Sequence, residues 1–237
     1  MHEIADNFRD IKERVARAAF RAGRNPEEIT IIAVTKNQTI DTIREGIQAG
    51  INIIGENRVQ ELVDKYEALE NQVQWHFIGH LQTNKVKYVI DKVHLIHSLD
   101  RLSLAEEIER RGERKKLSVN ALVQVNVSGE ESKYGLPPEE LIPFLEKVSD
   151  RCKNINIKGL MTIAPYVADP EETRPFFRCL RELAEEVKER NIAGVKMDFL
   201  SMGMTNDFEV AVEEGANMVR IGRAIFNTTQ EWRKGNG

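Results

Sequence analysis

The residues best suited to do chemistry are one lysine and a group of small polar residues near the end of the chain. Lys36 follows four apolar residues and a threonine, which predicts a desolvated amine able to form an imine with a carbonyl. Ser201 and Thr205 carry hydroxyl donors, and Gly203 and Gly222 let backbone amides approach an anion closely. A solvated lysine and glycines that only mark turns are the simpler alternatives.

Eight short apolar runs must supply the framework that positions these residues. Several are continuously apolar and rich in isoleucine and valine, which is typical of strands buried on both faces of a parallel sheet. We therefore expect eight strands, in runs that begin at Thr30, Asn52, Val73, Val93, Asn120, Ile155, Met197 and Ala216.

Stretches with helical spacing separate the apolar runs. Asp100 and Gly112 predict the beginning and the end of one helix. Asn206 and Glu209 have the spacing of a capping box, which predicts that another helix begins near Asn206. The opening segment has one apolar stripe, with residues at intervals of four and three: Ile4, Phe8, Ile11, Val15 and Ala18.

The order of these elements predicts an α/β fold, a (β/α)8 TIM barrel with an extra N-terminal helix. Consecutive parallel strands need crossover connections, and eight strand–helix units occupy about 250 residues. The chain has 237 residues, so a single barrel domain over residues 1–237 is expected. A doubly wound open sheet is the alternative, but a glycine-rich turn would then follow the first strand, where Thr35, Lys36 and Asn37 stand.

The predicted barrel brings the chemical residues to one end. Active sites lie at the C-terminal ends of barrel strands, and the seventh and eighth strands commonly form a phosphate site. The helix expected near Asn206 would direct its N-terminal dipole to that phosphate. A phosphate site across the barrel from Lys36 describes a pocket for a phosphorylated aldehyde, for which pyridoxal 5′-phosphate is the obvious candidate.

Composition excludes several other classes of protein. Lys+Arg number 34 and Asp+Glu 38, a net charge of −4 that argues against a nucleic-acid binder. No apolar run reaches the roughly 20 residues of a membrane helix, and the N-terminus has no signal-peptide core. Two cysteines make neither a disulfide framework nor a zinc site. We expect a cytoplasmic protein without metal, membrane or nucleic-acid partners.

Six segments carry a family resemblance that spans nearly the whole chain. In chain order they are VTKNQ, GENRVQE, WHFIGHLQTNK, GLMTIAP, LSMGMTND and MVRIGRAIF. The chain resembles the pyridoxal phosphate homeostasis protein family, single-barrel relatives of the alanine racemase N-terminal domain. This resemblance implies the same barrel that the apolar pattern predicts.

The resemblance also implies a role for individual residues. Lys36 would form the internal aldimine with pyridoxal 5′-phosphate, and Arg220 would contact the ring nitrogen. Further pocket residues would be Asn57, His80 and Met161. The phosphate would be held by Ser201, Gly203, Met204, Thr205, Gly222 and Arg223. No catalytic residue and no metal ligand is implied.

Arg220 restricts the chemistry that this site would support. Arginine stays protonated and only donates hydrogen bonds, so it would leave the ring nitrogen unprotonated. An unprotonated ring withdraws electrons less well, which argues against aminotransferase-type chemistry. Racemisation, or simple binding and release, stays open.

The resemblance suggests a carrier that buffers pyridoxal phosphate and hands it to apo-enzymes, and a single closed barrel suggests a monomer. An amino-acid racemase is the alternative, but racemisation needs an acid or base on each face of the α-carbon. Of the four tyrosines, only Tyr166 is expected close to a strand end. A barrel enzyme that acts on a sugar phosphate through a lysine imine would use the same features.

A few residues depart from the family pattern or extend it. Arg58 replaces a common aromatic residue, Thr205 replaces a serine, and Asn227 replaces a glycine. Arg58 would alter the pocket mouth, and Asn227 the course of the last loop. Lys133 is similar to a lysine proposed as a secondary coenzyme site, although a solvated loop lysine is the simpler interpretation.

Overall fold

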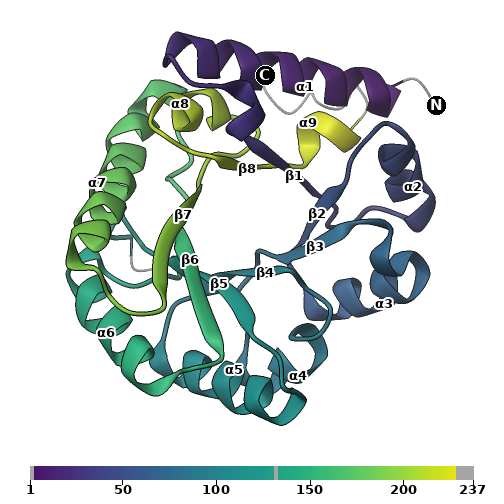
Figure 1. Ribbon diagram of the computed structural model, residues 1–237. Coiled ribbons are helices and arrows are strands. Elements are labelled where there is room, and N and C mark those ends of the chain that lie inside the picture. Colours follow the sequence, from purple (N-terminus) through teal and green to yellow (C-terminus); the bar gives the residue numbers. More distant parts are fainter. Residues whose placement is uncertain (1–2, 131–132, 228–237) are drawn as a thin grey trace.

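Eight parallel strands close into a barrel in chain order, which confirms the predicted fold and rules out the open sheet (Figure 1). The computed structural model describes residues 3–130 and 133–227, so both ends of the predicted domain 1–237 lie outside it. Each strand pairs with the next, and β8 pairs with β1. The strands are β1 (Thr30–Val34), β2 (Ile53–Glu56), β3 (Gln74–Phe77), β4 (Leu95–Leu99), β5 (Val119–Gln124), β6 (Ile155–Met161), β7 (Val195–Ser201) and β8 (Met218–Ile221).

Helices follow the strands and form the outer ring of the barrel. They are α2 (Ile40–Gln48), α3 (Val59–Leu69), α4 (Val86–Val89), α5 (Leu102–Lys115), α6 (Leu141–Arg151), α7 (Arg174–Arg190), α8 (Phe208–Glu213) and α9 (Arg223–Phe226). The predicted extra helix is α1 (Glu3–Arg21), which packs against α8 and α9. Its apolar stripe is buried from Phe8 to Ala18 and partly buried at Ile4, and Arg14 on its polar side donates to Glu209 Oε1 over 2.8 Å.

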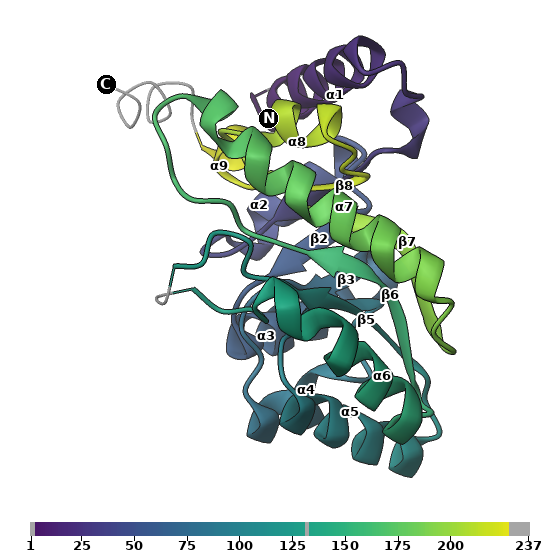
Figure 2. The same ribbon diagram turned by 90° about the vertical axis from the view of Figure 1, so that its left-hand side faces the viewer.

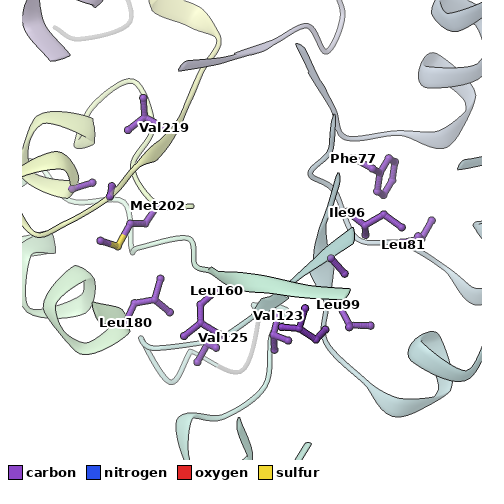
Figure 3. Close-up of a cluster of buried hydrophobic side chains, with 14 of the residues drawn as sticks. Phe77, Leu81, Ile96, Leu99, Val123, Val125, Leu160, Leu180, Met202 and Val219 are labelled. Carbon is purple, nitrogen blue, oxygen red and sulfur yellow. The ribbon is translucent and has the colours of Figure 1, made fainter. Parts of the chain in front are cut away.

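Two apolar layers hold the barrel together, because successive side chains of a strand face opposite sides of its wall. In the outer layer, Leu160 of β6 lies on the same side of the wall as Leu180 of α7 (Figure 3). The inner layer is filled by Ile32, Leu95, Leu122, Met161 and Met218.

Two of the predicted helix boundaries are wrong. Helix α5 begins at Leu102 rather than after Asp100, and it continues past Gly112 to Lys115. Gly112 lies inside the helix because this face packs closely on the next segment: a Cβ there would lie 2.9 Å from the carbonyl oxygen of Leu117. The glycine therefore marks a close approach of the backbone and not a helix end.

The capping box expected at Asn206 and Glu209 is also absent from the described structure. Helix α8 begins at Phe208, after Asp207. Asp207 Oδ1 accepts the backbone N–H of Met204 over 2.6 Å, which holds residues 204–207 in a turn before the helix. Glu209 faces α1 instead, where it pairs with Arg14 and Arg21.

Two histidines share the barrel interior with the inner apolar layer. His76 of β3 and His97 of β4 are both buried. Burial lowers the pKa of His76 to about 4 and the pKa of His97 well below its ordinary value. The folded protein therefore keeps both rings neutral at pH values where an unfolded chain protonates them.

We expect acid to destabilise the fold through these histidines. Their lowered pKa values contribute stability that is complete above pH 6.5, the unfolded value, and is lost as the pH falls toward 4. The lowered pKa of His76 alone should reduce the free energy of unfolding by about 2 kcal/mol between pH 7 and pH 5, and His97 should act in the same direction. Urea denaturation at each pH measures this, and His76→Gln should flatten the dependence. Stability that stays constant over this range would show that the two histidines are not held neutral by burial.

Candidate functional site

A pocket of about 400 Å³ opens where the barrel strands end. Its walls come from the ends of β1 and β8 and from the segments that follow β6 and β7. Figure 2 shows the segment between β6 and α7 running out to one side of the barrel. The predicted site residues that line the pocket are Lys36, Met204, Thr205, Arg220, Gly222 and Arg223.

The other predicted site residues do not line this pocket. Met161 belongs to the inner apolar layer. Asn57 follows β2, and its buried Oδ1 has no hydrogen-bond partner among the described residues. His80 follows β3, where its ring stacks on Tyr134 with centroids 3.9 Å apart and its Nδ1 lies 3.4 Å from Asp100 Oδ2.

Ser201 and Gly203 lie next to residues that line the pocket, but do not line it themselves. Ser201 is the last residue of β7, and its hydroxyl accepts a hydrogen bond from Arg220. Gly203 has φ of 90° and packs against α8, where a Cβ would lie 2.6 Å from the Cβ of Ala211. The carbonyl oxygen of Gly203 accepts the backbone N–H of Arg220, so this glycine shapes the turn beside the pocket.

Lys36 stands on the pocket wall in the turn after β1, and its side chain is exposed. The expectation of a desolvated amine is therefore wrong for this structure, because the turn carries the lysine beyond the apolar strand. The next residue, Asn37, has φ of 61°, a left-handed conformation that asparagine tolerates.

A buried ion cluster outside the barrel wall fixes the turn that carries Lys36. Lys65 of α3 donates to Glu56 Oε1 over 2.6 Å, to the carbonyl oxygen of Thr35 over 2.7 Å, and to Glu61 Oε2 over 3.1 Å. Glu61 Oε2 also accepts the backbone N–H of Asn37 over 2.9 Å. The residues on both sides of Lys36 are thereby tied to one cluster.

The cluster sets one cation, Lys65, against two carboxyl groups, Glu56 and Glu61. Burial raises the pKa of Glu56, while hydrogen bonds from Lys65 and Thr35 act in the opposite direction. Sequence reasoning missed this cluster, although Glu61 and Lys65 have the four-residue spacing of a helix ion pair. That spacing is common on exposed helix faces, so only the fold showed that the pair is buried against the Lys36 turn.

Arg220 brings a buried positive charge to the floor of the pocket. Only 4% of the residue is exposed, and its guanidinium donates to Ser201 Oγ over 2.6 Å and to the carbonyl oxygen of Thr162 over 2.8 Å. Burial lowers the pKa of Arg220 to about 10, opposed by the charge of Asp207, so the group stays protonated at neutral pH. Both acceptors are neutral, so no carboxylate hydrogen-bonds to the buried guanidinium in the described structure. A polar ligand could therefore interact favourably with its charge.

The segments that follow β7 and β8 offer donors for an anion. The hydroxyl of Thr205 lines the pocket, and the backbone N–H groups of Thr205 and Gly222 have no acceptor within the described part of the chain. The N–H of Met204 is already used by Asp207. The prediction that hydroxyl residues and glycines after β7 and β8 gather at one place is therefore consistent with this geometry.

Sequence reasoning missed much of the wall formed by residues 164–170. Tyr166 lines the pocket with 78% of its surface exposed, and Pro165 and Val167 flank it. The sequence predicts Tyr166 close to a strand end, but the hydrophobic pattern gives no sign that it lines the pocket. Three residues singled out earlier lie elsewhere: Arg58 is exposed, Lys133 pairs with Glu130 over 3.0 Å, and Asn227 accepts a hydrogen bond from Asn7.

The fold and pocket define a barrel of the alanine racemase N-terminal domain class, whose family model matches residues 2–230. A pyridoxal phosphate homeostasis protein of Aquifex aeolicus (strain VF5) is 48% identical over 218 residues, covering 91% of this chain and 94% of the relative. The chain belongs to the family of pyridoxal phosphate homeostasis proteins.

Solved structures agree with this placement. A protein of unknown function from Bifidobacterium adolescentis superposes with a TM-score of 0.90 and 37% identity, covering 95% of both chains. PipY of Synechococcus elongatus PCC7942, solved with pyridoxal phosphate bound, has a TM-score of 0.80 and 34% identity, covering 92% of this chain and all of PipY. Among the described residues, no helix is long and apolar enough to cross a membrane.

We expect the Lys65 cluster to be essential for stability. Lys65→Met leaves Glu56 buried without its cation, so the free energy of unfolding should fall by about 3 kcal/mol in urea denaturation. Adding Glu56→Gln should recover part of that loss. Lys92→Met, which removes a pair nearer the surface, should cost less than about 1 kcal/mol. Equal costs for the two lysines would contradict a buried cluster.

Proposed function

We propose that this chain binds pyridoxal 5′-phosphate in the pocket at the C-terminal end of the barrel and holds it through Lys36. Its role would be to buffer the coenzyme and deliver it to apo-enzymes in the cytoplasm, as a monomer and without catalysis of its own. The observation that carries the proposal is the placement of Lys36, the Arg220 cation and unpaired backbone amides around one pocket.

The pocket residues fit this coenzyme. A volume of about 400 Å³ is within the range of small-molecule sites. The buried guanidinium of Arg220 has more N–H donors than the two hydrogen bonds to Ser201 and Thr162 use, so it can donate to a further acceptor. The free N–H groups of Thr205 and Gly222 suit phosphate oxygens. Names of relatives and the PipY complex point to the same ligand.

Each group of residues has a separate task in this proposal. Pyridoxal phosphate, when bound, supplies an aldehyde that condenses with an amine with loss of water, and Lys36 Nζ provides that amine. Arg220 would lie at the ring nitrogen, and because arginine only donates hydrogen bonds it would leave that nitrogen unprotonated. Thr205, Gly222 and Arg223 would hold the phosphate, with Gly203 and Met204 shaping the turn that leads to Thr205. Asn57, His80 and Met161 stay predicted as further pocket residues.

The surroundings of the pocket favour a carrier over a racemase. Racemisation needs a positioned acid or base on the face opposite Lys36. Among the described residues, Tyr166 is the tyrosine on the pocket wall, and it is largely exposed to solvent. A solvated phenol on a loop is poorly placed to move a proton at a fixed carbon atom, so binding and release fit this pocket better.

We expect the purified protein to be yellow, and borohydride should remove the colour while it fixes the coenzyme covalently at Lys36, because hydride reduces the C=N bond to a stable amine. Peptide mass spectrometry locates the adduct, and Lys36→Met should remove it and weaken binding at least tenfold, since the covalent bond is lost. Lys133→Met is the matched control and should keep both colour and adduct. A colourless protein that takes up no coenzyme, or an adduct confined to Lys133, would overturn the proposal.

A second measurement separates carrier from racemase. The holo-protein is incubated with single enantiomers of amino acids, and chiral chromatography follows the loss of optical purity. We expect no loss beyond that given by free pyridoxal phosphate. Turnover that Tyr166→Phe abolishes would instead establish racemisation with Tyr166 as the second base.

A further inference from the structure

A chain of hydrogen bonds crosses the barrel interior beneath the pocket. Arg220 donates to Ser201 Oγ over 2.6 Å, and Ser201 Oγ lies 2.9 Å from Nδ1 of His97. Nε2 of His97 in turn lies 2.9 Å from Nδ1 of His76. The chain thus runs from β8 through β7 and β4 to β3, and all four residues are buried.

Barrel geometry places these four residues on the inside. Met218 belongs to the inner layer, and Arg220, two residues later on β8, faces the same way. The same step leads from Leu95 to His97 on β4 and from Phe199 to Ser201 on β7. Arg220, His97 and Ser201 therefore each lie one inward-facing step closer to the pocket than an apolar residue of the same strand.

The direction of the hydrogen bonds follows from the chemistry of their ends. The guanidinium of Arg220 only donates, so Ser201 Oγ must accept from it. If His97 also donated to Ser201, the hydroxyl hydrogen would be left without an acceptor among the described residues. Each polar hydrogen from Arg220 to His97 has an acceptor in the chain when Ser201 donates to Nδ1 of His97 and Nε2–H of His97 donates to Nδ1 of His76.

Two features keep this direction in place. Burial holds both imidazoles neutral, so each ring has one donor and one acceptor nitrogen. His76 also lines a cavity of about 370 Å³ at the opposite mouth of the barrel, together with Gln74 and Asn120. The remaining nitrogen of His76, Nε2, can therefore form a hydrogen bond with a polar group or a water molecule in that cavity.

The proposed function assigns the phosphate to this end of the barrel, and Ser201 was expected to bind it. In the arrangement above, the single hydroxyl hydrogen of Ser201 is committed to His97, and one of its lone pairs to Arg220. Thr205, by contrast, lines the pocket and has no such commitment. The two hydroxyl residues therefore have different tasks.

We propose that Ser201 and His97 are positioning residues that fix the Arg220 guanidinium toward the coenzyme ring, and that Ser201 does not serve the phosphate. This inference rests on the proposed function, since it needs a coenzyme ring in the pocket. The inference also gives His97 and His76 a task. Without one, apolar side chains would be expected at these buried positions.

Pyridoxal, which lacks the phosphate, distinguishes the two roles of the hydroxyls. Dissociation constants for pyridoxal 5′-phosphate and for pyridoxal are measured by titration of the visible absorption band. Ser201→Ala should weaken both ligands by the same factor, about tenfold, because it loosens the contact to the ring. Thr205→Val, the matched control, should weaken pyridoxal phosphate and leave pyridoxal unchanged. Weakening of pyridoxal phosphate alone by Ser201→Ala would overturn the proposal.

Two substitutions of His97 test its contact with Ser201. The amide of asparagine lies as many bonds from Cβ as Nδ1, and the amide of glutamine as many as Nε2. His97→Asn should therefore keep the absorption maximum and affinity of the native protein, whereas His97→Gln should shift the maximum and weaken both ligands. Identical behaviour of the two folded variants would overturn the role of His97.

Controls separate this inference from the proposed function and from simple unfolding. Native protein without a Lys36 adduct would defeat the proposed function itself, before any variant is compared. Thermal denaturation checks that each variant folds. If His97→Gln does not fold, Ser201→Ala still decides the assignment, because it removes only one oxygen atom and leaves the histidine pair in place.

Discussion

Closure of the sheet is the constraint on which the rest of this molecule depends. In a closed barrel every strand residue faces either the helices or the interior, so the period of two in each strand sorts side chains into two environments. Apolar side chains fill the outer layer and much of the interior, as with Leu160 outside and Met218 inside. Polar side chains share the interior beneath the pocket, where Arg220 donates to Ser201.

Two clusters of buried polar groups, on opposite sides of the barrel wall, position the two principal site residues. From outside, Lys65 and its carboxylate partners hold the turn that carries Lys36. From inside, Ser201 and His97 lie behind Arg220. Removing one partner from a buried polar cluster costs more than the contact itself, since the group left behind stays desolvated. Such clusters therefore give the site a fixed geometry on an otherwise apolar scaffold.

This division of labour suits a protein that holds a coenzyme and lets it go. The proposed attachment point is Lys36, an exposed lysine on a braced turn. The groups proposed to contact the ring and the phosphate are the buried cation of Arg220 and backbone amides without a protein acceptor in the described structure. Tyr166 is the tyrosine of the described pocket wall, and it is exposed to solvent. This arrangement favours binding of the coenzyme over proton transfer at a substrate carbon.

The sequence by itself determined the barrel, because eight apolar runs alternating with amphipathic stretches leave few ways to bury both faces of a parallel sheet. It also located Lys36, Thr205, Arg220 and Gly222 at strand ends, where a pocket must form. Only the tertiary structure decided which of the predicted residues share that pocket. Helix α8 begins at Phe208 because Asp207 is engaged by the N–H of Met204, a contact that local spacing did not reveal. The Ser201–His97–His76 chain joins strands up to 125 positions apart, and such pairs meet only when the barrel closes.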